Sequence, residues 1–171
     1  IYFVFIWIFI FLAYGTTPYV SSLQATKQIS KLNYFISFGR KSSLLIGILS
    51  AGLLIFVSSQ LINFFEPTPN VSSKAISYLI LRSLGLPFYL LNMHSTAVLR
   101  GMKYPKITLY SSVIVGVSNV VLSYFLGIVL NFGITGIAVS SSIAFFISSL
   151  YSTKVLLSLI HISEPTRLWH I

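Results

Sequence analysis

Residues 107–130 read ITLYSSVIVGVSNVVLSYFLGIVL, a run without a single charged residue. The hydrocarbon core of a bilayer is about 30 Å thick, and a helix that crosses it needs about 20 consecutive apolar residues. After the short segment 131–133, a second apolar run covers about residues 134–156. The two runs therefore predict a pair of transmembrane helices joined by a very short connection.

Three further apolar runs precede this pair, at about residues 1–22, 42–62 and 76–99. The composition agrees, because 56% of the residues are hydrophobic and only 8% are charged, with a mean hydropathy of +0.91. A soluble domain carries about 25% charged residues. We therefore expect an all-α, polytopic transmembrane helix bundle with five spans, in a membrane that the sequence does not identify.

Basic residues gather in alternate connections between these spans. The first and third connections are rich in them, the second has only Lys74, offset by Glu66, and the fourth has none. Cytoplasmic loops of membrane proteins carry such an excess of Lys and Arg. We therefore expect the two rich connections on the cytoplasmic side or its organellar equivalent. Their residues are Lys27, Lys31, Arg40, Lys41, Arg100, Lys103 and Lys106. The net charge of +9 is then explained by the basic residues of the cytoplasmic connections. We therefore do not expect nucleic acid as a partner.

The residue types that catalysis and metal binding require are nearly absent. There is no cysteine, which excludes disulfides and thiolate metal sites. Before residue 157 the only acid is Glu66 and the only histidine is His94. General acid–base catalysis needs titratable groups within hydrogen-bond reach of each other. We expect neither an enzyme nor a metal site.

The C-terminal residues 157–171 read LSLIHISEPTRLWHI. Their first eleven residues resemble one reading frame of the transposase adapter used in DNA sequencing libraries. We interpret 157–171 as adapter translation rather than native protein, against the alternative of an amphiphilic tail that ends at Glu164-Pro165. Residues 1–156 would then be the membrane part. Because the chain begins with Ile1 inside an apolar run, we expect it to be a fragment of a longer protein.

Polar residues inside the predicted spans allow more than one interpretation. Arg82 indicates either a functional charge or a side chain that snorkels to the interface. Asn119 would bond across helices or line a cavity. We interpret His94 as a packing residue rather than a titrating group. Residues 23–41 predict a short amphipathic helix along the membrane interface.

Five motifs in order resemble those of the multidrug and toxic compound extrusion (MATE) family. They are GTTPYV at 15–20, YLILRSLGLP at 78–87, RGMKYPKITLY at 100–110, NVVL at 119–122 and GITGIA at 133–138. The resemblance covers about residues 10–156. It implies helices two to six of the first six-helix lobe in a transporter with two such lobes.

The resemblance also implies a function. Family members are antiporters that export small organic molecules against an H⁺ or Na⁺ gradient, by alternating access around a site between the lobes. Five residues would line the substrate cavity, namely Asn119, Ser123, Arg82, Pro18 and Pro87. The two prolines would also supply helix breaks. The partners would be membrane lipid, a small-molecule substrate and the remaining helices, with no cofactor beyond the coupling ion.

Two positions depart from the family pattern. Many members carry an acid four positions after the residue matched by Asn119, where this chain has Ser123. Tyr104 and Pro105 stand in the region of a common loop acid. Two alternatives remain, which are a lipid-linked sugar flippase with the same lobe fold and a non-transporting membrane scaffold or subunit.

Overall fold

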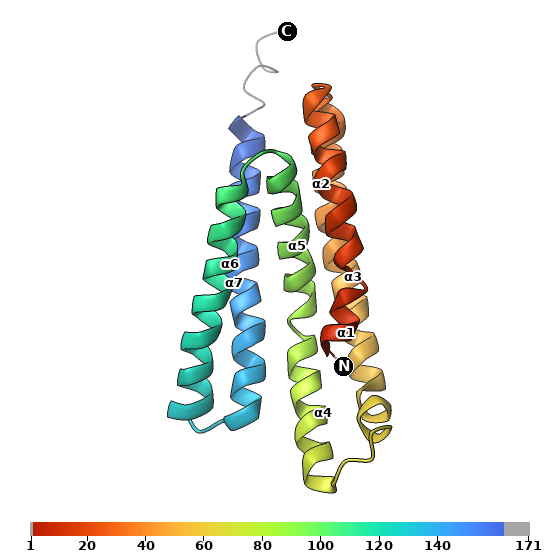
Figure 1. Cartoon of the computed structure of the whole chain (residues 1–171), viewed down its shortest axis with the longest axis vertical. Helices are drawn as coiled ribbons and strands as arrows, with labels where there is room; N and C mark the ends of the chain where they lie inside the picture. Colours follow the sequence, from red (N-terminus) through yellow and green to blue (C-terminus); the bar gives the residue numbers. More distant parts are fainter. Residues whose placement is uncertain (1, 163–171) are drawn as a thin grey trace.

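The computed structural model describes residues 2–162, and this part is helical without strands (Figure 1). The all-α prediction is therefore confirmed. The predicted non-native tail lies outside the described residues from 163 onward, and the last helix continues to Ile162. The elements are α1 (Tyr2–Trp7), α2 (Ile10–Ala25), α3 (Ile29–Asn63), α4 (Pro69–Ser83), α5 (Leu86–Gly101), α6 (Pro105–Ser123), the π-helical η1 (Tyr124–Val129) and α7 (Gly133–Ile162).

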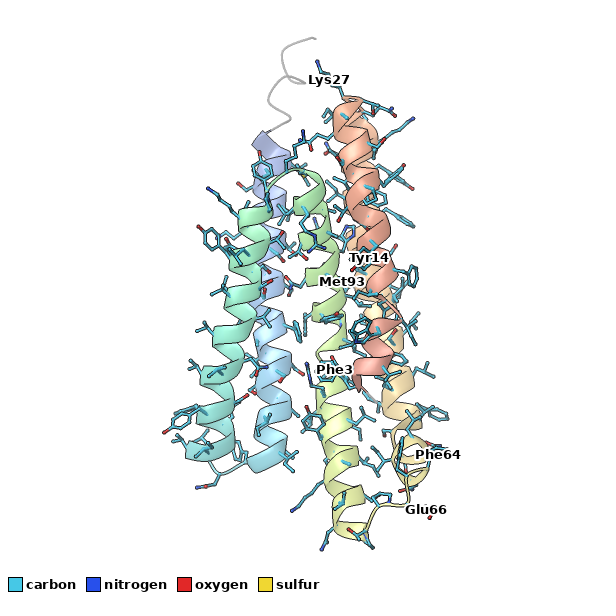
Figure 2. All side chains as sticks on the ribbon, viewed as in Figure 1. Phe3, Tyr14, Lys27, Phe64, Glu66 and Met93 are labelled. Atoms are coloured by element: carbon cyan, nitrogen blue, oxygen red, sulfur yellow. The ribbon has the colours of Figure 1, made fainter. Side chains whose placement is uncertain are left out.

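The helices run up and down in an antiparallel bundle (Figure 1). The α2–α3 and α5–α6 connections lie at one end, and the α3–α4 and η1–α7 connections lie at the other. Figure 2 accordingly shows Lys27 and Glu66 at opposite ends of the molecule. The two connections rich in basic residues thus share one end, as the charge pattern predicts.

Within residues 2–162, three helical segments are long and apolar enough to cross a bilayer, namely α3, α6 with η1, and α7. A fourth span results if α4 and α5 cross the bilayer together, as one span that is bent by 43° at the break between them. The predicted first span does not meet this test, because the run is divided into a helix of 6 residues and one of 16. The break falls after Trp7, where the Phe9 amide donates to the nearer Ile6 carbonyl at 2.9 Å.

The predicted interfacial helix over residues 23–41 is wrong. Residues 29–63 form one helix of 35 residues, about 52 Å long at 1.5 Å per residue. Its first turns place Leu32 and Ile36 in a buried cluster with Val98 and Leu99 of α5. The apolar face of this segment is therefore covered by protein, so the segment extends the second span instead of lying along the membrane.

The bend between α4 and α5 is held by contacts on both sides. The Gly85 amide donates to the Arg82 carbonyl instead of the Leu81 carbonyl, four residues back, that a regular helix would use. The Ser142 hydroxyl of α7 donates to the Leu81 carbonyl at 3.0 Å. Pro87 occupies the first turn of α5, where its missing amide hydrogen costs no helical bond. The predicted break at Pro87 is therefore present, and α7 satisfies the freed backbone group.

On the opposite side of the bend, α3 approaches Pro87 at a glycine. A Cβ added at Gly47 would overlap the Pro87 Cα and lie 2.9 Å from the Pro87 nitrogen. Gly52, on the same helix, has no such neighbour within 4 Å. The close approach at Gly47 therefore depends on the absence of a side chain there.

We predict that Gly47→Ala in the complete protein lowers the thermal unfolding midpoint in detergent, since overpacking costs about 1–3 kcal/mol. Gly52→Ala is the matched control. It should leave the midpoint unchanged or slightly raised, because alanine favours a helix over glycine. Equal midpoints for the two variants would contradict the packing described at the bend.

Cysteine substitutions at Lys31 and Lys103 should be labelled from the same side of the membrane, and a substitution at Lys74 should be labelled from the other side. Each would be replaced by cysteine in a cysteine-free background and exposed to a membrane-impermeant maleimide in sealed cells and in inverted vesicles. Labelling of Lys31→Cys and Lys103→Cys from opposite sides would refute the charge-based topology.

Candidate functional site

A polar cluster joins α5, α6 and α7 in the interior of the bundle. The Asn92 Oδ1 atom accepts from the hydroxyls of Ser111 at 2.9 Å, Ser152 at 2.8 Å and Ser148 at 3.3 Å. Ser148 also lies 2.9 Å from the Ser111 carbonyl oxygen. The three serines are buried. One amide oxygen therefore connects three helices, which is a common use of polar groups between membrane helices.

Asn119 and Ser123 belong to a second polar cluster, between α6 and α7. The Asn119 amide donates to the Ser141 hydroxyl at 2.8 Å. Ser123 and Ser140 share a hydrogen bond of 2.6 Å. Both predicted residues are half-buried. The observed geometry is a bond across helices, and the predicted role of Asn119 and Ser123 in lining a substrate cavity stays a prediction.

A groove of about 530 Å³ lies between α2 and α5. Four of its residues come from α5 at spacings of four, three and four, so they form one stripe along the helix. Five come from α2 and form a matching stripe. Figure 2 shows Tyr14 and Met93, one from each helix, close to the same level of the bundle. The lining residues are Ile10, Ala13, Tyr14, Thr17, Pro18, Tyr89, Met93, Thr96 and Arg100.

Pro18 lies inside α2, which continues through it, so the predicted helix break at Pro18 is wrong. Next to Pro18, α2 is bound to α5, because the Thr17 hydroxyl donates to the Ala97 carbonyl oxygen at 3.1 Å. A Cβ at Gly101 would lie only 2.7 Å from the Thr17 carbonyl oxygen. Since proline has no amide hydrogen, the Tyr14 carbonyl loses its helical donor. Both Tyr14 and Pro18 line the groove.

Arg100, which the sequence analysis assigned to a basic connection, also lies at the α2–α5 groove. It closes the last turn of α5 and lines the groove. Together with Tyr14, Tyr89 and the threonines, it gives the groove both polar and apolar lining. Such a combination suits a small organic molecule.

Arg82 is buried in the bundle, at 7% exposure, so it does not snorkel to the interface. Its guanidinium carbon lies 4.4 Å from the centroid of the Tyr2 ring and 5.2 Å from that of Phe145. These are distances at which an aromatic ring attracts a cation. Phe145 packs edge-on against Tyr89, with ring centroids 5.1 Å apart, and Tyr89 lines the groove.

His94 is also buried, against Gly39 of α3, where an added Cβ would overlap the imidazole ring. A hydrogen bond links the imidazole to the Ile36 backbone, while its Nε2 atom has no partner among residues 2–162. His94 lines a pocket of about 390 Å³ that shares Ala13 and Met93 with the groove. This environment fits the packing role expected from the sequence.

The structure brings some of the predicted residues together and separates others. Pro18 and Arg100 share the groove, and Arg82 and Pro87 flank the bend. Asn119 and Ser123 bond to Ser141 and Ser140 of α7, close in sequence to Ser142, which contacts the bend. Sequence analysis missed Asn92, Tyr89, Met93 and Thr96. The spacing 89, 93, 96, 100 was the available signal for the stripe. Within the described chain, no group of three or more potential metal ligands is present.

Comparisons with known proteins agree with the motifs. The family model MatE matches residues 1–125. Protein DETOXIFICATION 43 of Arabidopsis thaliana is 36% identical over 115 residues, which are 66% of this chain and 21% of the relative. Lipid II flippase MurJ of Thermosipho africanus is 32% identical over 151 residues, 84% of this chain and 31% of the relative.

A third relative, Protein DETOXIFICATION 42 of Arabidopsis thaliana, is 33% identical over 104 residues, 58% of this chain and 20% of the relative. The chain therefore spans between a fifth and a third of the length of the curated relatives that it matches. No solved structure matches.

We predict that Asn92→Leu destabilises the complete protein, because the Ser111 and Ser152 hydroxyls lose their acceptor, whereas Ser148 keeps the Ser111 carbonyl. Interhelical hydrogen bonds in membranes contribute about 0.6 kcal/mol each, so the loss should be about 1 kcal/mol. Thermal or denaturant unfolding in detergent measures it. Ser112→Ala is the control, because that exposed hydroxyl donates to the Thr108 carbonyl of its own helix and bonds to no other helix in the described part of the chain. Equal stability of the two variants would contradict a structural role for the Asn92 cluster.

Proposed function

This chain belongs to the MatE family, the multidrug and toxic compound extrusion family that its motifs resemble, and from that membership we propose that the complete protein is a secondary active transporter. The protein is an integral membrane protein. It exports small organic molecules across the membrane in exchange for H⁺ or Na⁺. The match of the family model to residues 1–125 carries this proposal. The chain supplies helices two to six of one lobe, and the remaining helices lie outside it.

The groove between α2 and α5 supports a substrate path in this lobe. Its volume of about 530 Å³ is within the range of small-molecule sites, and its lining combines aromatic, aliphatic and polar groups. In alternating access, the lobe rocks against its counterpart around a site near the middle of the membrane. The groove would then hold part of the substrate, and the second lobe would close it.

The coupling ion has no carboxylate ligand in the described spans, because Glu66 lies exposed in the α3–α4 connection. An acid that binds H⁺ or Na⁺ would therefore come from the remaining helices. The basic residues at the end of the bundle shared by the α2–α3 and α5–α6 connections would fix the orientation and contact lipid headgroups.

A flippase for lipid-linked sugars is the second candidate. The relative named Lipid II flippase MurJ favours it, since the similarity extends over 84% of this chain. A non-transporting membrane scaffold is the third. Transport rather than catalysis is the activity that family membership supports.

Reconstitution of the complete protein in proteoliposomes separates these candidates. We expect gradient-dependent movement of a fluorescent organic solute such as ethidium, and no translocation of a fluorescent lipid-linked sugar. Movement of the lipid alone would favour the flippase. Movement of neither, from a protein that is folded and correctly oriented, would favour the scaffold.

In the same assay, Asn119→Leu should lower the initial rate of efflux about tenfold at unchanged expression. Loss of one buried polar interaction is worth about 1–2 kcal/mol, and 1.4 kcal/mol corresponds to a factor of ten in rate. Ser112→Leu places the same side chain at an exposed position of α6 and should leave efflux unchanged. Equal efflux by both variants at equal expression would contradict the cavity role of Asn119.

A further inference from the structure

His94 presents a buried hydrogen-bond acceptor that nothing in the described chain uses. The residue is 7% exposed, and its imidazole is hydrogen-bonded to the backbone at Ile36. The Ile36 amide lies inside α3, where the helix itself uses it, so the imidazole donates from Nδ1 to the Ile36 carbonyl. The neutral ring then has a lone pair on Nε2, and this atom has no partner among residues 2–162. A ligand that donates a hydrogen bond would satisfy it.

This acceptor lies at the wall of a mostly apolar pocket of about 390 Å³ between α2, α3 and α5. A Cβ added at Gly39 would lie 2.6 Å from Nε2, and both Gly39 and His94 line the pocket. The volume is within the range of small-molecule sites. One stripe of α3 forms the longest wall, and its residues are Phe35, Phe38, Gly39, Ser42, Ser43 and Ile46. Since Phe38 is 58% exposed, the pocket reaches the outside of the described bundle.

The acceptor also lies at the depth where the apolar run of α3 begins. This run covers about residues 42–62, and Gly39 stands one turn before it, followed by Arg40 and Lys41. Basic residues at the end of an apolar run mark the boundary between hydrocarbon and headgroups. The pocket continues from this boundary to Ile46, inside the apolar run. A ligand bound there has its polar group at the boundary and its apolar body in the hydrocarbon layer.

The donor of such a ligand is a neutral hydroxyl group. An anionic group would bring acceptors to Nε2, which is itself an acceptor. An ammonium group would be repelled by Arg40, which lies within electrostatic range of the His94 imidazole. Within residues 2–162 the only acid is Glu66, and Figure 2 shows it at the opposite end of the bundle from Lys27, so no carboxylate near the pocket offsets that repulsion.

The sequence of α3 beside the pocket favours a sterol among neutral alcohols. A Leu or Val, a Tyr and a Lys or Arg, each separated by one to five residues, form a pattern proposed for sterol contact, and Leu32, Tyr34 and Arg40 match it. The pattern alone is weak evidence, but here it coincides with the pocket. The Tyr34 ring stacks on Phe38 with centroids 6.1 Å apart. A rigid ring system suits these aromatic faces and loses little conformational freedom when it binds.

We propose that the pocket between α2, α3 and α5 binds a sterol from the membrane. The sterol hydroxyl donates to the Nε2 atom of His94, and the ring system lies along the stripe of α3 toward Ile46. The sterol is a bound component of the membrane and not a transported substrate, so the inference does not depend on the proposed function. Because Ala13 and Met93 line both this pocket and the α2–α5 groove, the bound sterol would lie against a wall of the groove.

Photolabelling of the complete protein in phosphatidylcholine nanodiscs tests the site. The probe is a cholesterol analogue with a photoreactive diazirine in its ring system, and the matched probe is its 3-O-methyl ether, which has no hydrogen-bond donor. We expect saturable labelling of α3 and α5, mapped by mass spectrometry and displaced by unlabelled cholesterol. The ether should label about fivefold less, which is the factor expected for the loss of one hydrogen bond.

Three variants assign the two parts of the ligand to the two parts of the site. His94→Leu removes the acceptor, so the alcohol and the ether should label it equally, whereas His94→Gln retains an acceptor and should recover part of the preference for the alcohol. Ser43→Leu fills the apolar part of the pocket and should lower labelling by both probes severalfold. The control is Ser112→Leu, which places the same side chain at an exposed position of α6 and should be labelled like the unaltered protein.

Several outcomes would overturn the proposal. They are equal labelling of the unaltered protein by the alcohol and the ether, labelling that maps outside the pocket, and labelling that Ser43→Leu leaves unchanged. Stronger displacement by a diacylglycerol than by cholesterol would also refute a sterol site. If His94→Leu fails to fold, the comparison of the two probes on the unaltered protein decides together with Ser43→Leu.

The transport assay is independent of this test. Efflux of ethidium by a protein that shows no labelling of the pocket would retain the transporter and reject the sterol site. Labelling that depends on His94 and Ser43, without movement of any solute, would retain the sterol site and reject export.

Discussion

Every backbone carbonyl and amide that lies at membrane depth must find its partner inside the protein, because hydrocarbon offers none. In this bundle the constraint is strictest at the bend between α4 and α5. The Ser142 hydroxyl donates to the Leu81 carbonyl in place of a helical amide. The absence of a side chain at Gly47 allows α3 to pack directly against Pro87. The bend is thus specified by three helices at once. It also leaves Arg82 immediately before the interruption, in the interior of the bundle.

The same constraint explains the many hydroxyl groups of this chain. Between membrane helices there is little hydrophobic driving force, so close packing and interhelical hydrogen bonds hold the bundle together. The Asn92 cluster and the Asn119 cluster both join α7 to its neighbours, at different depths. Buried serines therefore stand beside buried leucine and isoleucine side chains in the interior of this bundle. Many other large apolar side chains are exposed on its outside.

The helical spans and their order could be predicted because each depends on a long local property, which is apolar length or the charge of a connection. Features that depend on tertiary contact could not. No glycine or proline marks the break after Trp7, whereas Pro18, an apparent breaker, stays within α2 because α5 packs against it. The burial of Leu32 and Ile36 likewise requires α5 alongside. Composition placed Arg82 inside a span, but only the fold reveals its unused donor.

Ala13 and Met93 line both the α2–α5 groove and the pocket beside His94, so the two spaces meet at these side chains. Methionine is unbranched and turns about three bonds, which makes it an adaptable filler. A rotation of the Met93 side chain would therefore enlarge one of the two spaces and reduce the other. The sizes of the two spaces therefore depend on the conformation of one shared side chain.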